Sequence, residues 1–219
     1  GSAAVRLGEG VGSRFSPDGK RALAIWGPQR QRLALLPIGT VEVQEVERGG
    51  ITSYRAPRWF PDGKRILFGS AEAGRGMRLY LQVLDGGKPR PLTPEGVSPG
   101  WDLCNPISPD NKWVTAVRAD RRIVLYPVEG SEPRELAALE PGDKPVQWDV
   151  YGRSLYVMRS EEVRARVYRL DVSTGRRELW KEVVPPDPVG VFGFMNFMTT
   201  PDARSYAYTY MRQLSELYR

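Results

Sequence analysis

A short turn motif recurs five times along this chain, and its spacing restricts the fold more than any other feature. Residues 15–20 read FSPDGK, and the pattern returns as WFPDGK and ISPDNK, then in the degenerate forms WDVYGR and TTPDAR. The fourth motif residue stands at positions 18, 62, 110, 151 and 202, so the steps are 44, 48, 41 and 51 residues. A period of about 40 to 50 residues is typical of a propeller blade with four strands.

Each position of the motif has a conformational reason. Proline fixes φ for the first corner of a turn, and the aspartate after it can accept hydrogen bonds from backbone amides of that turn. Glycine in three copies supplies a positive φ without strain, and Asn111 is the next-best residue for that conformation. Ala203 in the fifth copy breaks this pattern, which predicts a different turn there.

Segments rich in β-forming residues follow each turn in the same order. The strands directly after the turns are expected at residues 22–26, 66–69, 113–117, 155–158 and 206–210. Third strands follow at residues 32–38, 78–84, 122–128 and 166–172, and short outer strands are expected near 91–93 and 178–180. With an inner strand before each turn, the sequence predicts an all-β protein, a β-propeller of four-stranded antiparallel blades.

The two ends of the chain predict how such a propeller closes. Residues 4–7 resemble an outer strand, whereas the carboxy end supplies an inner strand near 194–198 and two further strands at 206–210 and near 214–218. Pairing both ends would remove open sheet edges. We therefore expect five blades, the last assembled from both termini, in one domain of residues 1–219 that begins with the tag remnant Gly1-Ser2. The alternative is a fragment of a propeller with six or more blades.

The SPDGK turns at this spacing resemble the TolB-like, WD40-like (PD40) β-propeller repeat family, and the likeness covers nearly the whole chain. The final stretch, SYAYTYMRQLSELYR, is similar to the carboxy-terminal end of propeller regions attached to bacterial Ser/Thr protein kinases. The chain itself has no glycine-rich nucleotide loop, no HRD and no DFG. The resemblance implies a module of a larger signalling protein, with a covalently linked kinase domain, in a periplasmic or other extracytoplasmic location.

The stretch GVSPG at residues 96–100 matches the G-x-S-x-G pattern of α/β-hydrolases around Ser98. The chain has no histidine to take the serine proton and only one cysteine. We therefore interpret Ser98 as a loop residue, like the equivalent stretches at 10–13, 50–53 and 142–145. We expect no catalysis by this chain alone, no cofactor and no metal site, and we favour structural roles for the carboxylates of Asp102 and Asp149.

A formal net charge of +6 makes nucleic acid a partner to consider. Short basic clusters such as Arg121-Arg122 are scattered along the chain with acids nearby, and they form no arm or basic helix. We therefore expect no nucleic-acid binding. No stretch approaches the run of about 18 apolar residues that crosses a bilayer, so we expect no direct membrane insertion.

The candidate ligand-binding residues stand just before each inner strand and along its start, where the loops of all blades would converge on the channel mouth. They are Arg14, Tyr54, Arg58, Trp101, Asn105, Gln147 and Asn196. Arginine with tryptophan or tyrosine suits recognition of a peptide or of an anionic or sugar ligand. Packing of Trp101 between blades and pairing of Arg58 with Asp102 are the structural alternatives.

The function expected from these features is that of a non-catalytic binding or sensor module, which recognises a protein, a peptide or a small ligand at the channel mouth. An alternative stays open. It is the substrate-gating propeller of a prolyl-oligopeptidase-like peptidase whose catalytic domain lies outside these residues.

Overall fold

The computed structural model consists of strands, turns and connecting segments, and it describes residues 10–39, 42–98, 105–130, 132–136, 138–140, 142–200 and 202–214. In this part of the chain there is no helix of the length and apolar character needed to cross a membrane. The chain divides into two compact units. The first unit contains residues 1–99 with 117–119, and the second contains residues 100–116 with 120–219.

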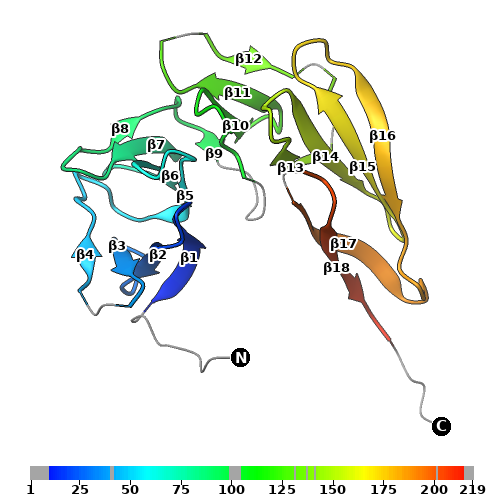
Figure 1. Ribbon diagram of the computed structural model, residues 1–219, viewed down its shortest axis with the longest axis horizontal. Coiled ribbons are helices and arrows are strands. Elements are labelled where there is room, and N and C mark those ends of the chain that lie inside the picture. The colour runs from blue at the N-terminus through cyan, green and yellow to red at the C-terminus, as the bar shows by residue number, and fades with distance from the viewer. Residues whose placement is uncertain are drawn as a thin grey trace. The chain divides into compact units, whose positions relative to one another are not determined.

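The strands of residues 10–91 form two four-stranded antiparallel sheets (Figure 1). The first sheet has the order β1 (Val11–Phe15), β2 (Arg21–Trp26), β3 (Arg32–Pro37), β4 (Gln44–Glu45). The second has the order β5 (Arg55–Trp59), β6 (Arg65–Ser70), β7 (Arg78–Val83), β8 (Arg90–Pro91). Strand order follows chain order in both, which confirms the predicted blade plan of one inner strand followed by three outward neighbours.

Two further four-stranded sheets and one hairpin follow in the described residues. The third sheet contains β9 (Val97–Ser98), β10 (Trp113–Arg118), β11 (Ile123–Pro127) and β12 (Arg134–Glu135). The fourth contains β13 (Asp143–Trp148), β14 (Ser154–Ser160), β15 (Ala165–Asp171) and β16 (Arg177–Val183), and the hairpin contains β17 (Val191–Thr199) and β18 (Tyr206–Arg212). The strand predicted at 4–7 and residues 215–218 of the strand predicted near 214–218 lie outside the described residues, so closure by both termini stays a prediction.

The segments that we interpreted as loops before the inner strands are themselves partly inner strand. Ser98 lies in β9 and pairs with Val117, so its prediction as a loop residue is wrong. In the same way β1 begins at Val11 and β13 at Asp143. The second strand of each sheet extends as far as these residues, and its backbone N–H and C=O groups need hydrogen-bond partners there. This requirement outweighs the local preference of glycine and proline for loops. Towards the predicted end of the third inner strand, Ile107 forms only an isolated bridge.

The five motif copies fold into the same tight turn. In the first copy the amide of Gly19 donates to the carbonyl oxygen of Ser16 at 2.9 Å, and the corresponding distances in the other copies are 2.9, 2.9, 3.1 and 2.8 Å. Oδ1 of Asp18 accepts a hydrogen bond from the amide of Lys20 at 3.0 Å, and the aspartates at 62, 110 and 202 accept the equivalent bond. The predicted role of the motif aspartate is confirmed.

The fourth copy has tyrosine in place of the motif aspartate, and Asp149 takes over its role. Oδ1 of Asp149 accepts hydrogen bonds from the amides of Arg153 at 2.8 Å and Ser154 at 3.2 Å. In the first copy these two bonds are divided between the carboxylate of Asp18 and the hydroxyl of Ser16. One buried carboxylate therefore replaces two polar groups, which gives Asp149 the structural role that we expected.

The prediction of a different turn at Ala203 is wrong. Ala203 has a φ of 56°, close to the 70° of Gly19. The hydroxyl oxygen of Thr200 accepts a bond from the amide of Ser205 at 3.1 Å, and Asp202 accepts one from Arg204 at 3.1 Å. These neighbouring bonds hold the alanine in a conformation that L-residues disfavour.

Replacing Ala203 by glycine is expected to raise the free energy of unfolding by about 0.5–1 kcal/mol, because relief of the positive φ exceeds the entropic cost of glycine. The control is Gly19→Ala, which introduces a Cβ with no atom within 4 Å and should therefore destabilise through φ alone. Denaturant unfolding of the two variants measures both effects. Equal stability of both variants and the parent would contradict this account of the turn.

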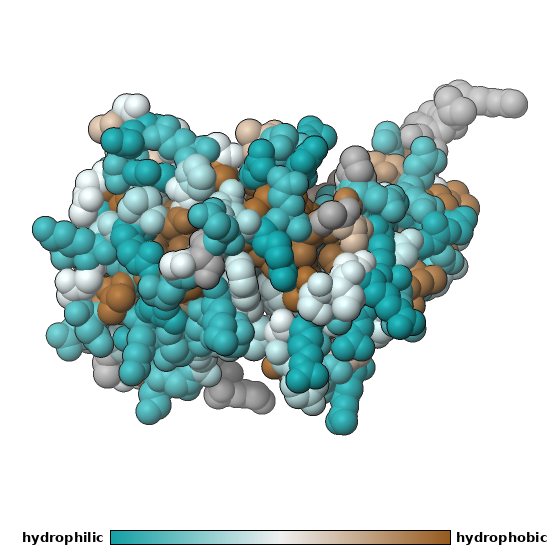
Figure 2. All heavy atoms as spheres, turned by 90° about the horizontal axis from the view of Figure 1, so that it is seen from above, coloured by the Kyte–Doolittle hydropathy of each residue, from teal (hydrophilic) through white to brown (hydrophobic). Residues whose placement is uncertain are grey.

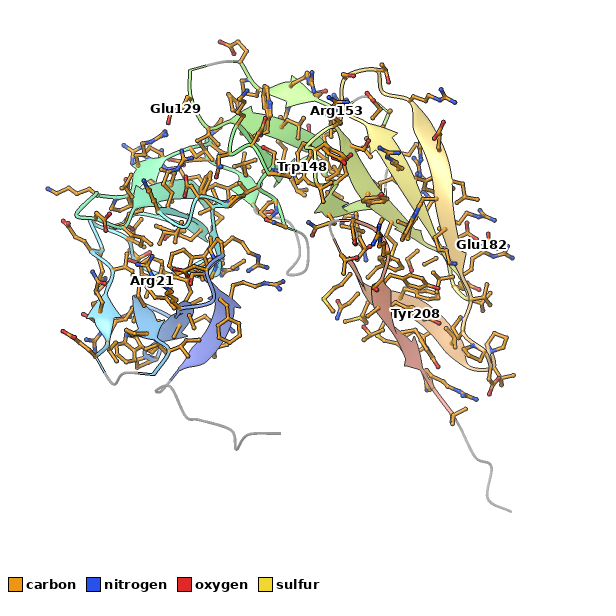
Figure 3. All side chains as sticks on the ribbon, viewed as in Figure 1. Arg21, Glu129, Trp148, Arg153, Glu182 and Tyr208 are labelled. Carbon is orange, nitrogen blue, oxygen red and sulfur yellow. The ribbon has the colours of Figure 1, made fainter. Side chains whose placement is uncertain are left out.

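Neighbouring sheets within each unit are joined by a repeated hydrogen bond. In the first unit Nε1 of Trp59 donates to the carbonyl oxygen of Arg14 at 3.2 Å, and in the second Nε1 of Trp148 donates to that of Pro106 at 3.3 Å. Both tryptophans open a motif copy, and both acceptors directly precede one. Trp148 lies at the end of β13 (Figure 3). Each bond joins the last residue of one inner strand to the residue that directly precedes the turn motif of the preceding sheet.

Apolar side chains fill the space between the sheets. In the first unit one cluster joins Leu23 and Ile25 of β2 to Phe68 of β6 and Tyr80 of β7. In the second unit a cluster joins Tyr156 of the fourth sheet to residues of the hairpin. On the face drawn in Figure 2, hydrophilic side chains predominate, and apolar ones are visible in the gaps between them.

Candidate functional site

The inner strands carry irregularities at the positions where we expected ligand contacts. Register shifts interrupt the pairing of four inner strands, at residues 12–15, 55–58, 145–147 and 194–196. Such bulges change the direction of side chains and are common beside binding sites. Ala56, inside the second of these bulges, has a φ of 45°. Positive φ at a residue other than glycine is a form of strain that often accompanies function.

Arg14 and Arg58 come from neighbouring inner strands of the first unit. Strand β1 lies against β5, and the Trp59 side chain bonds to the backbone of Arg14. Arg14 is exposed, whereas Arg58 is only 8% exposed and its Nη1 donates to the carbonyl oxygen of Pro57 at 3.0 Å. Arg14 is therefore open to a ligand in solution, and Arg58 is largely enclosed.

Tyr54 is a core residue. It has no exposed surface, and its ring packs edge-on against Phe68 at 4.9 Å between ring centroids. A side chain without exposed surface cannot contact a ligand in solution, so Tyr54 is removed from the candidate site. Burial raises the pKa of its hydroxyl to about 12.

Replacing Tyr54 by phenylalanine is expected to raise the free energy of unfolding by about 1 kcal/mol. The hydroxyl is buried without a hydrogen-bond partner among the residues that the structure describes, and leaving such a group unpaired costs stability. Denaturant titrations of the two proteins measure the difference. A loss of stability would show that the hydroxyl is bonded in solution.

The same substitution should change the response to alkali. The tyrosine of the unfolded chain loses its proton near pH 10, whereas folded Tyr54 does so only near pH 12. The folded state therefore binds more protons within this window, and Tyr54 makes stability fall as pH rises through it. The variant lacks this contribution, so its stability should decline less steeply.

In the second unit, Gln147 on β13 and Asn196 on β17 are half-buried, and their strands lie against each other. Asn105 is also half-buried, and its Oδ1 accepts a long bond of 3.4 Å from the amide of Ile107. Trp101 and Asp102 lie outside the described residues. The structure thus places four predicted site residues on two pairs of contacting inner strands, Arg14 and Arg58 on β1 and β5 and Gln147 and Asn196 on β13 and β17. All four lie in the second half of their strands and not at the starts, where we predicted them.

Two arginines of the first unit escaped the sequence-based selection. Arg55 is the first residue of β5 and is exposed, and exposed Arg30 lies in the connection between β2 and β3. The amide of Tyr54 donates to the carbonyl oxygen of Arg30 at 2.8 Å, which fixes this connection beside the start of β5. Arg55 could have been selected from the sequence, because it directly follows the candidate Tyr54. Arg30 could not, because only a hydrogen bond between segments distant in sequence brings it to the start of β5.

A shallow hollow opens beside the start of β1. Its lining consists of Gly10, Val11, Ile25, Trp26, Gly27, Pro28, Arg30 and Arg32. The guanidinium carbon of Arg32 lies 4.9 Å from the ring centroid of Trp26, a cation–π contact. The hollow combines apolar surface with positive charge, which suits a ligand that carries both apolar groups and negative charge.

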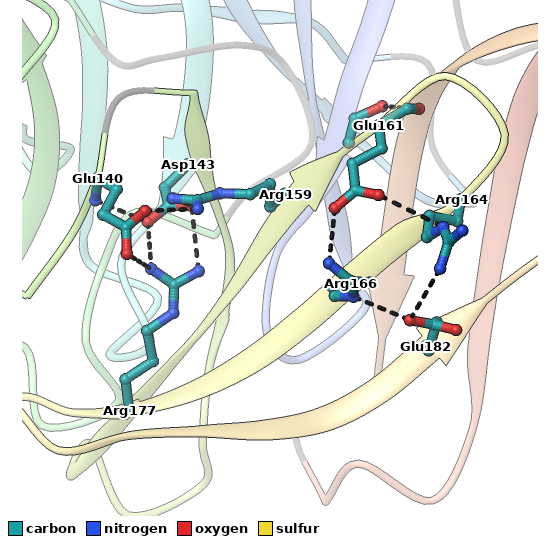
Figure 4. Close-up of polar contacts among 9 residues, drawn as sticks. Glu140, Asp143, Arg159, Glu161, Arg164, Arg166, Arg177 and Glu182 are labelled. Carbon is teal, nitrogen blue, oxygen red and sulfur yellow. Dashed lines mark hydrogen bonds and ion pairs between the residues drawn. The ribbon is translucent and has the colours of Figure 1, made fainter.

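An ionic cluster of the second unit surrounds one buried carboxylate and consists of Glu140, Asp143, Arg159 and Arg177 (Figure 4). The Asp143 carboxylate is fully buried, at 2.9 Å from Nη2 of Arg159 and 2.8 Å from Nη1 of Arg177, and it accepts a bond from the amide of Glu140 at 2.8 Å. A hydrogen bond from Arg159 lowers the pKa of Glu140. Because the charged groups of the cluster bond to one another, we assign it a structural role. Among the described residues, no group of three histidine, cysteine, aspartate or glutamate side chains could hold a metal ion.

Comparison with known proteins identifies the fold. No protein-family model matches the chain. Among curated proteins, the uncharacterized peptidase YuxL of Bacillus subtilis (strain 168) is 32% identical over 98 residues, which make up 40% of this chain and only 15% of that protein.

Among solved structures, a TolB from Agrobacterium tumefaciens matches 93% of this chain and 70% of its own, with a TM-score of 0.66 and 19% identity. One of two structurally analysed prolyl endopeptidases matches 91% of this chain and 31% of its own, with a TM-score of 0.61 and 16% identity. Together with the four-stranded sheets, these matches show that the chain has the fold of a TolB-like β-propeller.

Proposed function

We propose that this propeller module is a non-catalytic binding or sensor domain, which recognises a protein, a peptide or a small ligand at the channel mouth, through residues of its inner strands. The observation that supports the proposal is the bulge beside Arg14, Gln147 and Asn196 in three different inner strands. Packing of the sheets alone would not require the inner strands to interrupt their regular pairing at these positions. The carboxylates of Asp143 and Asp149 are engaged in structural bonds, and the chain has no histidine to act as a base.

The experiment is a binding screen of the isolated chain against peptide and metabolite libraries by fluorescence polarisation and calorimetry. Arg14→Ala and Trp101→Ala should weaken binding of any ligand found. Lys20→Ala is the matched control, because Lys20 is also exposed but lies in the turn that follows β1. Absence of binding in the screen, or wild-type affinity of both test variants, would contradict the proposed function.

A second candidate is the substrate-gating propeller of a prolyl-oligopeptidase-like peptidase. It is favoured by the two peptidase matches, of which this chain spans 15% and 31%. Sequencing the source gene on both sides of these residues separates the candidates. A downstream α/β-hydrolase domain with its own nucleophile elbow and histidine would support the gate, whereas an upstream kinase domain would support a sensor.

The signalling context and the extracytoplasmic location belong to the same proposal. They rest on the likeness of the fold to TolB and on the similarity of the final stretch to kinase-associated propellers. Fractionation of cells that express the full-length gene tests the location, since the module should be protected from protease added outside the outer membrane and accessible once that membrane is opened.

A further inference from the structure

Three exposed arginines of the first unit lie on connected segments. Arg14 lies on β1, whose backbone is bonded to Trp59 of the adjacent strand β5. Arg55 starts β5, and the amide bond from Tyr54 to Arg30 fixes the β2–β3 connection beside it. Arg30 also lines the hollow that begins at Val11 of β1. Arg14 near the end of β1, Arg55 at the start of β5 and Arg30 in the β2–β3 connection therefore lie on neighbouring segments of the first unit, and we call these three residues the three-arginine surface.

The acids near these segments are occupied by other arginines. Glu45 pairs with Arg32, and Glu72 pairs with Arg75 and Arg78. Glu95 accepts a bond from the amide of Gly76 at 2.9 Å and pairs with Arg75 at 3.5 Å. Of the other exposed acids, Asp18 follows β1 and accepts hydrogen bonds from the Ser16 hydroxyl and the Lys20 amide, and Asp62 pairs with Arg65. Asp85 lies in the β7–β8 connection, and Glu42 and Glu47 flank β4, at the opposite edge of the sheet from β1.

By contrast, Arg14, Arg30 and Arg55 have no ion pair with any residue that the structure describes. Arginine presents a planar set of donors that matches a carboxylate with two parallel bonds. A surface that keeps three such groups free of internal acids is complementary to negative charge.

Apolar groups are interspersed with these charges. Val11 is 62% exposed and Phe15 is 63% exposed, and both lie on β1 with Arg14. Pro28 and Trp26 contribute further apolar surface to the hollow. Arginine and aromatic side chains together are typical of surfaces that bind other proteins.

We propose that the ligand of the three-arginine surface is an acidic peptide segment of another protein, whose carboxylates bind Arg14, Arg30 and Arg55 and whose apolar side chains contact Val11 and Phe15. The inference rests on the proposed binding function and adds the chemistry of the partner. A peptide is favoured over a small anion because the arginines come from three separate segments with apolar residues between them.

The test uses two fluorescein-labelled peptides, one in which glutamate alternates with leucine and one with glutamine in place of glutamate. The glutamate peptide should bind at least about tenfold more tightly, since charge-assisted bonds account for the difference. Its affinity should fall as salt is added. Arg30→Ala and Arg55→Ala should each weaken it about tenfold, while Arg55→Lys should restore part of the affinity.

Lys88→Ala is the matched control, because Lys88 is an exposed cation in the connection between β7 and β8, the two outer strands of the second sheet. Equal binding of the two peptides, or equal affinity of the arginine variants and Lys88→Ala, would overturn the inference. In that case a ligand found in the broad screen would leave the proposed binding function intact. Citrate that binds as tightly, with the same dependence on the arginines, would overturn the assignment of a peptide.

Discussion

Replacing Asp143 by alanine is expected to lower the free energy of unfolding by about 3–5 kcal/mol, the usual cost of removing one partner from a buried ion pair. The carboxylate is fully buried, and it neutralises two arginine side chains that are only 25% and 15% exposed. Without it, Arg159 and Arg177 would be left close together with Glu140 as their remaining acid. Denaturant unfolding followed by circular dichroism measures the loss.

The second ionic cluster of the same unit supplies the control. Glu182 pairs with Arg166, and both side chains are at least 32% exposed. Glu182→Ala should cost less than about 1 kcal/mol, because water screens exposed pairs. Asp143→Asn keeps the shape of the side chain but removes its charge, so its loss of stability should lie between those of Asp143→Ala and Glu182→Ala. Equal losses for Asp143→Ala and Glu182→Ala would show that the buried cluster contributes no more than a surface pair.

Trp148→Ala is expected to cost about 3–5 kcal/mol, the range measured for removal of large aromatic side chains from protein cores. Trp148 is among the largest fully buried side chains of the chain, and its indole also bonds to the backbone of Pro106. The substitution would leave a cavity and remove a link between two neighbouring sheets. Thermal and denaturant unfolding give the loss of stability.

Trp148→Phe separates these two contributions. It keeps most of the apolar volume but removes the indole donor, so a loss of about 1–2 kcal/mol is expected. Trp59→Phe should behave in the same way, because Trp59 makes the equivalent bond to Arg14. Tyr151→Ala is the control in the adjoining turn, since Tyr151 is largely exposed and its removal should change little. Wild-type stability of both phenylalanine variants would exclude a role for the inter-sheet bond.

The turn motif could be interpreted from sequence because its chemistry is local. Proline, aspartate and glycine each determine the conformation of their own neighbourhood, and the expected bonds of Asp18 and its equivalents are present. Ala203 shows the limit of that reasoning, because bonds made by Thr200 and Asp202 override the preference of one residue. Ser98 shows a second limit, since the pairing requirement of a neighbouring strand is invisible in the local composition.

The candidate site was harder to predict because it depends on contacts distant in sequence. Tyr54 and Arg55 are consecutive, yet one is in the core and the other is exposed, and nothing in the sequence indicates which of the two side chains faces solvent. The carboxylate of Asp143 is bound by arginines 16 and 34 residues further along the chain. A sequence repeat predicts which backbone positions are equivalent in successive sheets. It does not predict which side chains from different strands contact one another.

The indole–carbonyl bonds also provide a spectroscopic consequence. Trp59 and Trp148 are buried in different units, each hydrogen-bonded across one boundary between sheets. Their emission should therefore shift to longer wavelength only when that boundary opens to water. Two single-tryptophan variants, one with only Trp59 and one with only Trp148, would report on the two units independently. Different midpoints would reveal stepwise melting, and coincident midpoints would reveal a single cooperative transition.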